Sequence, residues 1–590
     1  MEKISLIVLD THREDSLEKL REIGVLHLQS TTASSETLTG LKEDRTILEN
    51  ALRLLPEPEA PDEAAAADVW SAMQVASKAA GLAEKGQTLT EESNRLQREA
   101  AELAEWGDYD PADILTLREK GTDIRLYRLT RQQLGEIPEG VKTFVLKHAK
   151  SISNVALVLT GEQEEVPFDE IPLPERGLSE VERILAEKQS ALEETKKELT
   201  DLAARKPAIE SALRKMDGSI EFETAYAGME VDEKLAFLTG YAPAARVDDL
   251  KKAAAAYGWA IVVEDPAEDD PVPTLIENPK WIRIIDPVFK VMGTVPGYRE
   301  FDISMWFLVF FSVFFAMLIG DGGYGLVFLI LTSVAHLLFR KKVLSEPFIL
   351  MYVLSTCTVI WGALTGNWFG CEAISRVPLL NGIIVPSVYA FSKDSEEVVK
   401  YMCFLVAAIQ LSLAHLLRAL KTINSLKSLS QIGWSIVVWG MFLGLRELIL
   451  EMPAPWFMIH MIGLGLGLAF VFASPSKNIL KMISFQNVID LFMSFIDVFK
   501  DSLSYIRLFA VGMATLAVAQ SFNSLGAQIG FSKLYLIPAS AFIIVGGHVL
   551  NIVLALMSVA VHGLRLNMLE FSGHIGMEWA GQQYSPFRKK

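Results

Sequence analysis

Residues 488–522 read VIDLFMSFIDVFKDSLSYIRLFAVGMATLAVAQSF, and this stretch decides the fold because it is apolar enough to form one long helix. At about 1.5 Å per residue, such a helix is roughly 52 Å long, whereas the hydrocarbon core of a bilayer is about 30 Å thick. We therefore expect it to tilt strongly or to extend beyond the hydrocarbon. We expect the helix to end near Phe522, because the following Asn523, Ser524, Leu525 and Gly526 favour a break.

The charges divide the chain into two unlike halves. Residues 1–300 carry 58 acidic and 36 basic residues, and residues 301–590 carry 14 acidic and 19 basic residues, so the net charges are −22 and +5. The acidic half repels phosphate, which excludes nucleic-acid binding through a basic patch. The cysteines lie in apolar stretches, which excludes a disulfide scaffold. They are Cys357, Cys371 and Cys403. No signal peptide is evident, so we expect the first half to stay in the cytoplasm.

The second half contains eight runs without Asp, Glu, Lys or Arg, each about long enough to cross a bilayer. These runs are 303–320, 322–339, 347–371, 401–417, 428–445, 452–476, 508–532 and 534–564. Basic residues gather in the loops on one side, as the positive-inside rule requires of a cytoplasmic face. They are Arg340, Lys341, Lys342, Arg418, Lys421, Lys427, Lys477, Lys481 and Arg588 to Lys590. We expect an integral, multi-pass membrane protein with its soluble half and C-terminus in the cytoplasm.

The soluble half shows three patterns. Strand, helix and strand follow one another near 1–35 and again within 218–270, so these two pieces can share one sheet. Residues 108–172 form a second lobe, with VKTFVLK (141–147) and NVALVLTG (154–161) as its expected strands. Leucines then recur every seven residues along a predicted helix, and such a seam needs an apolar partner. They are Leu178, Leu185, Leu192 and Leu199.

Two further helical stretches, near 36–55 and 70–106, can cover this seam by folding back; an intermolecular coiled coil is the alternative. We therefore predict an α+β cytoplasmic domain, residues 1–300, in which two small α/β lobes are joined by a long helical coiled-coil bar. An all-α membrane domain, residues 301–590, follows with about eight transmembrane helices, of which the last two are long and tilted.

Sites for nucleotides, cofactors and metals are not recognisable in the sequence. The nearest match to a phosphate-binding loop, at residues 81–88, has Gln87 where the phosphate-binding lysine is needed, and it lies in a helical stretch. Gly463, Gly465 and Gly467 lack the preceding strand of a dinucleotide fold, so helix packing explains them better. The histidines show no metal-ligand spacing. We expect no ATP-hydrolytic site, no metal and no cofactor.

Two arginines stand inside apolar runs. Arg507 lies nineteen residues into the long helix, and Arg565 ends the eighth run, three residues after His562. Burying an arginine costs at least about 2.5–3.5 kcal/mol on insertion scales, so such residues mark ion or substrate paths. Arginine stays charged and can attract a carboxylate without passing on a proton. The alternative for Arg507 is a shorter span from which it reaches the membrane surface.

Three polar residues approach Arg507 along one side of the long helix. Asp497, Asp501 and Ser504 are spaced by four and three residues, which aligns them on a helix. This stripe is either the lining of a water-filled path from the cytoplasm or the polar face of an interfacial helix.

Several motifs together resemble subunit a, also called subunit I, of the vacuolar/archaeal-type rotary ATPases. They are SYIRLFAVGMA (504–514), GHVLNIVLALMSVAVHGLRLNMLEF (547–571), YSPF (584–587) and LIGDGGYG (318–325). The resemblance covers essentially the whole chain and is more specific around the two arginines than in the soluble half. It implies a stator, with residues 1–300 as its cytoplasmic domain and residues 301–590 as its ion-translocating domain. A ring of proteolipid subunits, each with one membrane carboxylate, would turn against Arg507 and Arg565, and ions would pass through two offset half-channels.

The resemblance also implies partners and further site residues. The partners are the proteolipid ring of c-, K- or L-type subunits, the peripheral-stalk subunits E and G, the C/d-type socket subunit of the central stalk, and membrane lipid, in a prokaryotic plasma membrane. His548, Asn551 and His562 either line the half-channel on the far side or make helix-packing hydrogen bonds. Many eukaryotic relatives have a glutamate where this chain has Ala555, so the route of that half-channel stays open.

Two other classes of protein compete with the stator. A secondary transporter with a cytoplasmic regulatory domain predicts related halves within the membrane region, and the two arginines have no counterpart in the first four spans. A membrane-anchored scaffold would use the buried arginines only for packing.

Overall fold

The computed structural model describes residues 1–29, 34–58, 68–138, 141–148, 152–160, 166–339, 345–473, 485–530 and 535–589. The chain forms two compact units. The first comprises Glu2–Asp265 together with Pro586–Lys590 and is called the soluble unit, after the half predicted to be soluble. The second comprises Pro266–Ser585 and is called the bundle. The chain therefore passes from one unit to the other after Asp265 and returns after Ser585. The basic residues Arg340–Lys342, Lys477, Lys481 and Lys590, used above to predict sidedness, lie outside the described residues.

The first lobe is an antiparallel sheet built from both ends of the soluble unit, as predicted. Its strands lie in the order β2-β8-β1-β9, and β7 pairs with β8. Every second residue of β1 is buried, at Ile4, Leu6 and Val8, which gives the sheet one apolar face. Two helices accompany the strands, and Phe587 from the C-terminal segment belongs to the same core. The elements are β1 (Glu2–Leu9), α1 (Arg13–Ile23), β2 (His27–Leu28), β7 (Glu230–Asp232), β8 (Leu235–Ala242), α8 (Val247–Tyr257) and β9 (Ala260–Glu264).

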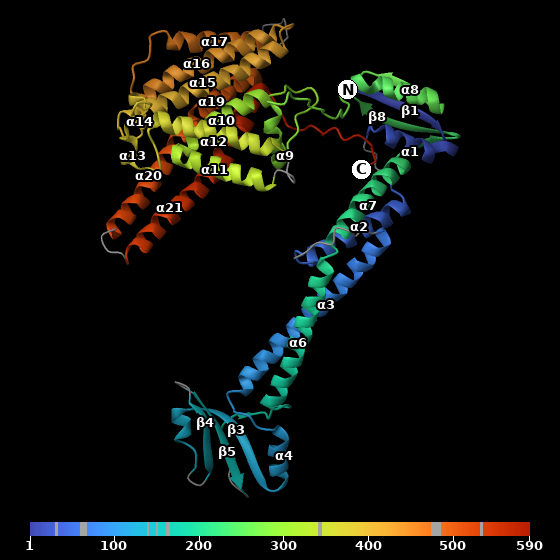
Figure 1. The fold of residues 1–590 in the computed structure, drawn as a ribbon, viewed down its shortest axis with the longest axis vertical. Coiled ribbons are helices and arrows are strands. Elements are labelled where there is room, and N and C mark those ends of the chain that lie inside the picture. The colour runs from blue at the N-terminus through green and yellow to red at the C-terminus, as the bar shows by residue number, and fades with distance from the viewer. Residues whose placement is uncertain are drawn as a thin grey trace. The chain divides into compact units, whose positions relative to one another are not determined.

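In the described part of the chain, four helices form the predicted bar. Figure 1 shows the bar running between the two lobes. Leu178 and Leu185 of the heptad seam pack against Leu96, Ala100 and Leu103. This end of the seam is thus covered within the chain by α3, as folding back predicts. The helices are α2 (Glu36–Leu54), α3 (Val69–Leu103), α6 (Leu178–Ala203) and α7 (Lys206–Ala227).

The second lobe is a four-stranded antiparallel sheet in the order β4-β5-β3-β6. The two expected strands are present, as β4 and β5, but β3 was not expected from the sequence. Charged residues of β3, such as Asp123 and Arg125, interrupt the pattern of apolar residues that predicts a strand. These two side chains form an ion pair in the structure. The elements are α4 (Pro111–Glu119), β3 (Thr122–Thr130), α5 (Arg131–Leu134), β4 (Lys142–His148), β5 (Ile152–Thr160) and β6 (Glu170–Ile171).

The second unit is a bundle of apolar helices. Among the described residues, six segments are long and apolar enough to cross a membrane, and two shorter apolar helices lie at the first and sixth predicted spans. The last two segments have 44 and 39 residues. The helices are α9 (Asp286–Met292), α10 (Ser304–Ile319), α11 (Gly322–Phe339), α12 (Ser345–Thr365), α13 (Glu372–Ser375), α14 (Pro378–Asn381), α15 (Ser395–Lys421), α16 (Lys427–Leu450), α17 (Met458–Ala473), α19 (Phe485–Ser504), α20 (Ile506–Ile529), α21 (Ile537–Ser558) and α22 (Ser572–Ile575).

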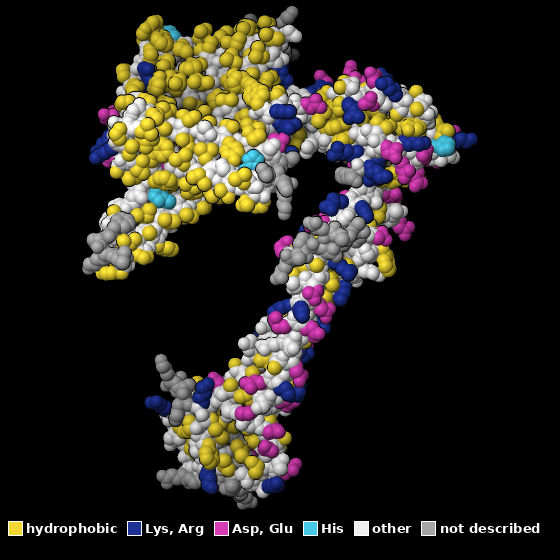
Figure 2. All heavy atoms as spheres, in the orientation of Figure 1, with side chains coloured by type: hydrophobic (Ala, Val, Ile, Leu, Met, Phe, Trp, Pro, Cys, Tyr) yellow, Lys and Arg dark blue, Asp and Glu magenta, His cyan; other side chains and the backbone are white. Residues whose placement is uncertain are grey.

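The surface of this bundle is apolar. Figure 2 shows hydrophobic side chains over most of its visible face, whereas the bar carries alternating acidic and basic groups. Leu337, Leu338 and Phe542, for example, are at least 70% exposed. A soluble protein rarely exposes so continuous an apolar surface, which fits contact with lipid.

The long helix differs from its prediction at two points. It does not end at Phe522, because α20 continues to Ile529. Its polar end is supported by contacts: Asn523 Nδ2 donates to the Phe369 carbonyl, and Ser540 Oγ of α21 donates to the Gly526 carbonyl. Tertiary packing therefore overrides the local break signal. The segment is instead interrupted at Tyr505, between α19 and α20.

Candidate functional site

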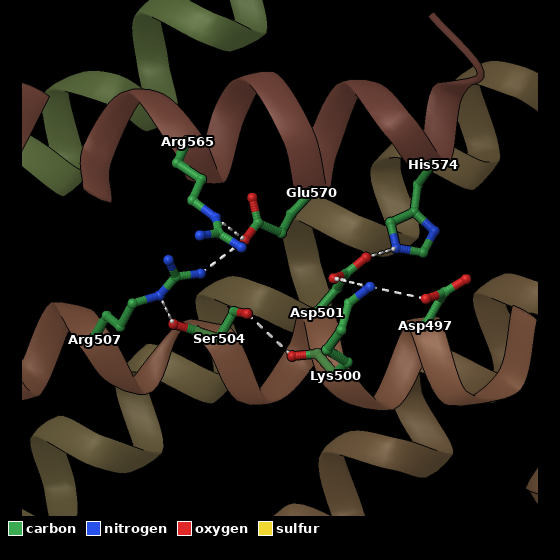
Figure 3. A network of polar contacts seen from close by, with 8 residues as sticks. All are labelled: Asp497, Lys500, Asp501, Ser504, Arg507, Arg565, Glu570 and His574. Atoms are coloured by element: carbon green, nitrogen blue, oxygen red, sulfur yellow. Dashed lines mark hydrogen bonds and ion pairs between the residues drawn. The ribbon is translucent and has the colours of Figure 1, made fainter. Parts of the chain in front are cut away.

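The two arginines predicted inside the membrane helices meet at one carboxylate. Arg507 lies in the first turn of α20, and Arg565 lies on the helix that continues α21. Arg507 Nη2 is 2.7 Å from Glu570 Oε1, and Arg565 Nε is 3.5 Å from the same oxygen. Figure 3 shows the two guanidinium groups converging on Glu570. One carboxylate oxygen therefore contacts positive groups from two helices.

The helix that carries Arg565 and Glu570 is π-helical at Val559–Gly563 and Leu566–Phe571. In an α-helix of 3.6 residues per turn, side chains five residues apart point about 140° away from each other. A π-turn closes its hydrogen bond between residues i and i+5, so the fifth residue returns close to the side of the first. The wider turns thus help to bring Glu570 to the side of Arg565. Such turns occur frequently at functional sites.

Burial differs sharply within this cluster. The Glu570 side chain is 3% exposed, the Arg507 side chain 22% and the Arg565 side chain 53%. The carboxylate is therefore inside the bundle, and Arg565 reaches its outer surface. Arg507 Nε also donates to the Ser504 carbonyl at 2.9 Å, which fixes the guanidinium beside the interruption at Tyr505.

A second polar group lies along α19. Asp501 Oδ2 is 3.1 Å from His574 Nε2 of α22, and both side chains are largely buried. Lys500 Nζ is 2.8 Å from Asp497 Oδ1 and 3.7 Å from Asp501 Oδ1, with Lys500 and Asp497 mostly exposed. The predicted stripe thus runs from an exposed acid to a buried one (Figure 3).

A cavity of about 360 Å³ opens beside this stripe. Asp497 and Asp501 line it, together with polar groups from α15, α16 and α22 that include His415, Gln431 and His574. Ser504 is not among its lining residues; its hydroxyl donates to the Lys500 carbonyl within the helix. A polar cavity of this size has room for several water molecules.

The other predicted histidine and asparagine form a third polar group. His548 Nδ1 is 2.8 Å from the Tyr324 hydroxyl, and His548 Nε2 is 3.1 Å from Asn523 Oδ1. Asn551 Nδ2 donates to the Tyr324 hydroxyl and to the Thr515 carbonyl. These hydrogen bonds join α11, α20 and α21, and they are compatible with both expected roles.

His562 and Ala555 lie apart from that group. His562 Nδ1 is buried and has no hydrogen-bond partner among the residues that the structure describes. Ala555 is 2% exposed and packs in the main apolar core of the bundle.

Sequence reasoning missed several residues of the site. Glu570 was overlooked because five-residue spacing does not align side chains on an α-helix, although it is the single acidic residue between Arg565 and Met577. Gln410 was also missed: it accepts from the Tyr505 hydroxyl and donates to Asn567 Oδ1, both at 2.8 Å, and all three residues are buried. His415 and His574 carried no spacing signal, because they come from different helices.

The described side chains also bear on whether the site could bind a metal ion. Within the described ranges, no group of three or more His, Cys, Asp or Glu side chains is arranged to hold a metal ion.

Known proteins resemble the chain over its full length. The V-type ATP synthase subunit I of Borreliella burgdorferi is 33% identical over 612 aligned residues, which cover 100% of this chain and 99% of that protein. The chain belongs to the V/A-type ATP synthase subunit I family. V-type ATP synthase subunit I 1 of Treponema pallidum is 31% identical, with coverage of 100% and 99%. The A-type ATP synthase subunit I of Archaeoglobus fulgidus is 24% identical over 59% of this chain and 58% of that protein.

Two other comparisons add little to the subunit I assignment. No family model matches the sequence. The crystal structure of the cytoplasmic N-terminal domain of subunit I, homolog of subunit a, of V-ATPase covers 45% of this chain and 100% of that one, at 17% identity. Its TM-score of 0.24 is too low to carry an argument about the fold.

Membership in the subunit I family confirms the resemblance predicted from the motifs. It makes the chain a membrane subunit of a rotary ATPase, with a soluble N-terminal domain and several apolar helices. The secondary-transporter alternative is thereby set aside.

Proposed function

We propose that this chain is the ion-translocating stator subunit of a rotary ATPase or ATP synthase. It faces a rotating ring of proteolipid subunits and couples proton or sodium movement to ATP hydrolysis or synthesis. One observation carries the proposal: two permanently charged guanidinium groups, Arg507 and Arg565, converge at the edge of an apolar bundle, where Arg565 is 53% exposed. A cation at such a surface is costly in lipid, and an acidic partner from another subunit relieves that cost.

The arginine pair attracts the ring carboxylates without exchanging protons with them. At about 4 Å and an effective dielectric constant near 20, one guanidinium attracts a carboxylate by roughly 4 kcal/mol. This attraction favours ion release when a ring carboxylate arrives. Because an arginine keeps its proton, the ion does not pass through the pair. It travels with the ring between two separate half-channels.

The two further polar groups supply candidate linings for these half-channels. The cavity with Asp497, Asp501 and His574 suits the cytoplasmic path, which leads past Ser504 toward Arg507. His548, Asn551 and His562 suit the path on the far side, with His562 Nδ1 as a buried group without a described partner. Tyr324 joins His548 and Asn551 there.

The soluble unit is the part of the stator that meets the stalks. Its two lobes bind the peripheral-stalk subunits E and G, and the lobe on the membrane side lies near the C/d-type socket subunit of the central stalk. The net charge of −22 on residues 1–300 is compatible with basic partner helices. The soluble unit lies in the cytoplasm, and the bundle lies in a prokaryotic plasma membrane.

The deciding experiment replaces Arg507 by alanine in the complete complex, reconstituted into lipid vesicles. ATP-driven ion uptake should fall to background while ATP hydrolysis continues in part, because the ring then turns without exchanging ions. Arg565→Ala should lower uptake by about ten- to a hundredfold, since a charge-assisted contact contributes about 1.5–3 kcal/mol.

Arg446→Ala is the matched control. Arg446 lies in α16 of the same bundle and donates to the Pro453 carbonyl, so its loss should leave uptake unchanged. Normal uptake by the Arg507→Ala complex would reject the proposed function.

A further inference from the structure

Glu570 is a buried carboxylate that is held by ion pairs rather than by backbone hydrogen-bond donors. Its Oε1 contacts both guanidinium groups, and its buried Oε2 has no hydrogen-bond partner within the described part of the chain. Asp321 of the same bundle is the contrast. It is 1% exposed, and its two oxygens accept four backbone N–H groups, from Gly323, Tyr324, Phe369 and Gly370. The fold thus satisfies Asp321 with fixed donors, whereas Glu570 is held by the two arginines.

The formal charges of Arg507, Arg565 and Glu570 can be added to give the net charge of this cluster. The two guanidinium groups are permanently positive, and Glu570 forms an ion pair with each of them through Oε1. Two positive charges and one negative charge leave a net charge of plus one. This equals the charge needed to neutralise one ionised carboxylate from outside the chain.

We propose that Glu570 is a positioning residue that sets the arginine pair to bind one ring carboxylate at a time. This inference rests on the proposed stator function. Because Coulomb attraction scales with net charge, the pair without Glu570 would hold a ring carboxylate about twice as strongly or engage two at once. Either event slows the departure of the carboxylate. Glu570 therefore keeps the attraction strong enough to exclude slip and weak enough to let the ring advance.

The test changes the net charge in both directions in the reconstituted complex and measures ion uptake and ATP hydrolysis together. Glu570→Gln raises the cluster to plus two. We expect coupled hydrolysis and uptake to slow together, by about tenfold or more, with the number of ions moved per ATP unchanged. Arg565→Gln lowers the cluster to zero, and we expect the opposite defect: hydrolysis continues while the number of ions moved per ATP falls.

The double variant Arg565→Gln/Glu570→Gln separates a charge effect from a structural one. It restores a net charge of plus one, so its turnover should exceed that of Glu570→Gln alone. Glu570→Asp, which keeps the charge, should stay near the wild-type rate. A double variant no faster than Glu570→Gln would overturn the proposal, because loss of packing is not repaired by removing a second side chain.

If the complex with Glu570→Gln fails to assemble, the Arg565→Gln complex still tests the proposal. The Arg565 side chain is half exposed, so its replacement opens no cavity in the core. An unchanged number of ions per ATP in that variant would overturn the charge balance. Such a result leaves the stator function itself standing, because that function is rejected only by normal uptake in Arg507→Ala.

Discussion

The helical bar and the membrane bundle both pair arginine with glutamate, but in opposite surroundings. In α6, Arg183 Nη1 lies 2.8 Å from Glu187 Oε1, and both side chains are 64% exposed. In the bundle, Arg507 Nη2 lies 2.7 Å from Glu570 Oε1, and Glu570 is 3% exposed. Water and salt screen the first pair, whereas the second has little of either around it. Two ion pairs of nearly the same length therefore differ in what their loss does to the protein.

The same contrast extends to what holds each unit together. The soluble unit buries apolar side chains and leaves its ion pairs on the surface. The bundle, whose surroundings are already apolar, adds buried polar links between helices, such as Tyr505–Gln410–Asn567. In both units, substitutions of buried side chains should accordingly cost more than substitutions of exposed ones.

The largest effect is expected from Phe587→Ala in the soluble unit. Phe587 is 1% exposed in the core of the first lobe, so its truncation should destabilise that lobe by about 3–5 kcal/mol. Limited proteolysis of the full-length protein in membranes measures this loss as faster cleavage of the lobe. Phe144→Ala is the control, because Phe144 is 55% exposed in the same unit. Equal protease resistance of the two variants would contradict the ranking.

A smaller but clear effect is expected from Gln410→Leu in the bundle. The Tyr505 hydroxyl and the Asn567 side chain each lose a buried partner, and two hydrogen bonds at about 0.5–1.5 kcal/mol each give a loss of about 1–3 kcal/mol. The thermal midpoint of the detergent-solubilised complex should fall. Gln528→Leu, at an exposed position of α20, should leave that midpoint in place; a matching drop there would show that the buried link is not responsible.

The smallest effect is expected from Arg183→Ala on the bar. An exposed pair four residues apart on a helix contributes about 0.3–0.5 kcal/mol. A double-mutant cycle with Glu187→Ala, measured by denaturant unfolding, isolates this coupling. A value well above 1 kcal/mol would break the comparison between bar and bundle.

Much of this architecture follows from local patterns in the sequence. Runs without charged residues located the apolar segments, the heptad leucines predicted an apolar helical partner for α6, and charge inside apolar runs singled out Arg507 and Arg565. These signals work because each depends either on residues close together in the sequence or on the cost of placing a charge in an apolar medium.

The parts that failed depend on tertiary contacts. The predicted end of the long helix was wrong, because Asn523 and Gly526 stay helical through hydrogen bonds with residues of other segments. Glu570 could not be paired with Arg565 on an α-helical wheel, because the pairing depends on π-helical turns. The Asp501–His574 contact joins residues 73 positions apart, and no sequence period connects them.

The burial of Phe587 also bears on the order in which the protein is made. The phenylalanine ring stacks near Phe222, and its backbone N–H donates to the Leu26 carbonyl, so the N-terminal lobe contains a piece of the far end of the chain. That piece cannot be synthesised until the ribosome has translated every helix of the bundle. The lobe begun first during translation is therefore completed only after the membrane segments exist, which delays formation of its finished surface until the hydrophobic part of the protein has been made.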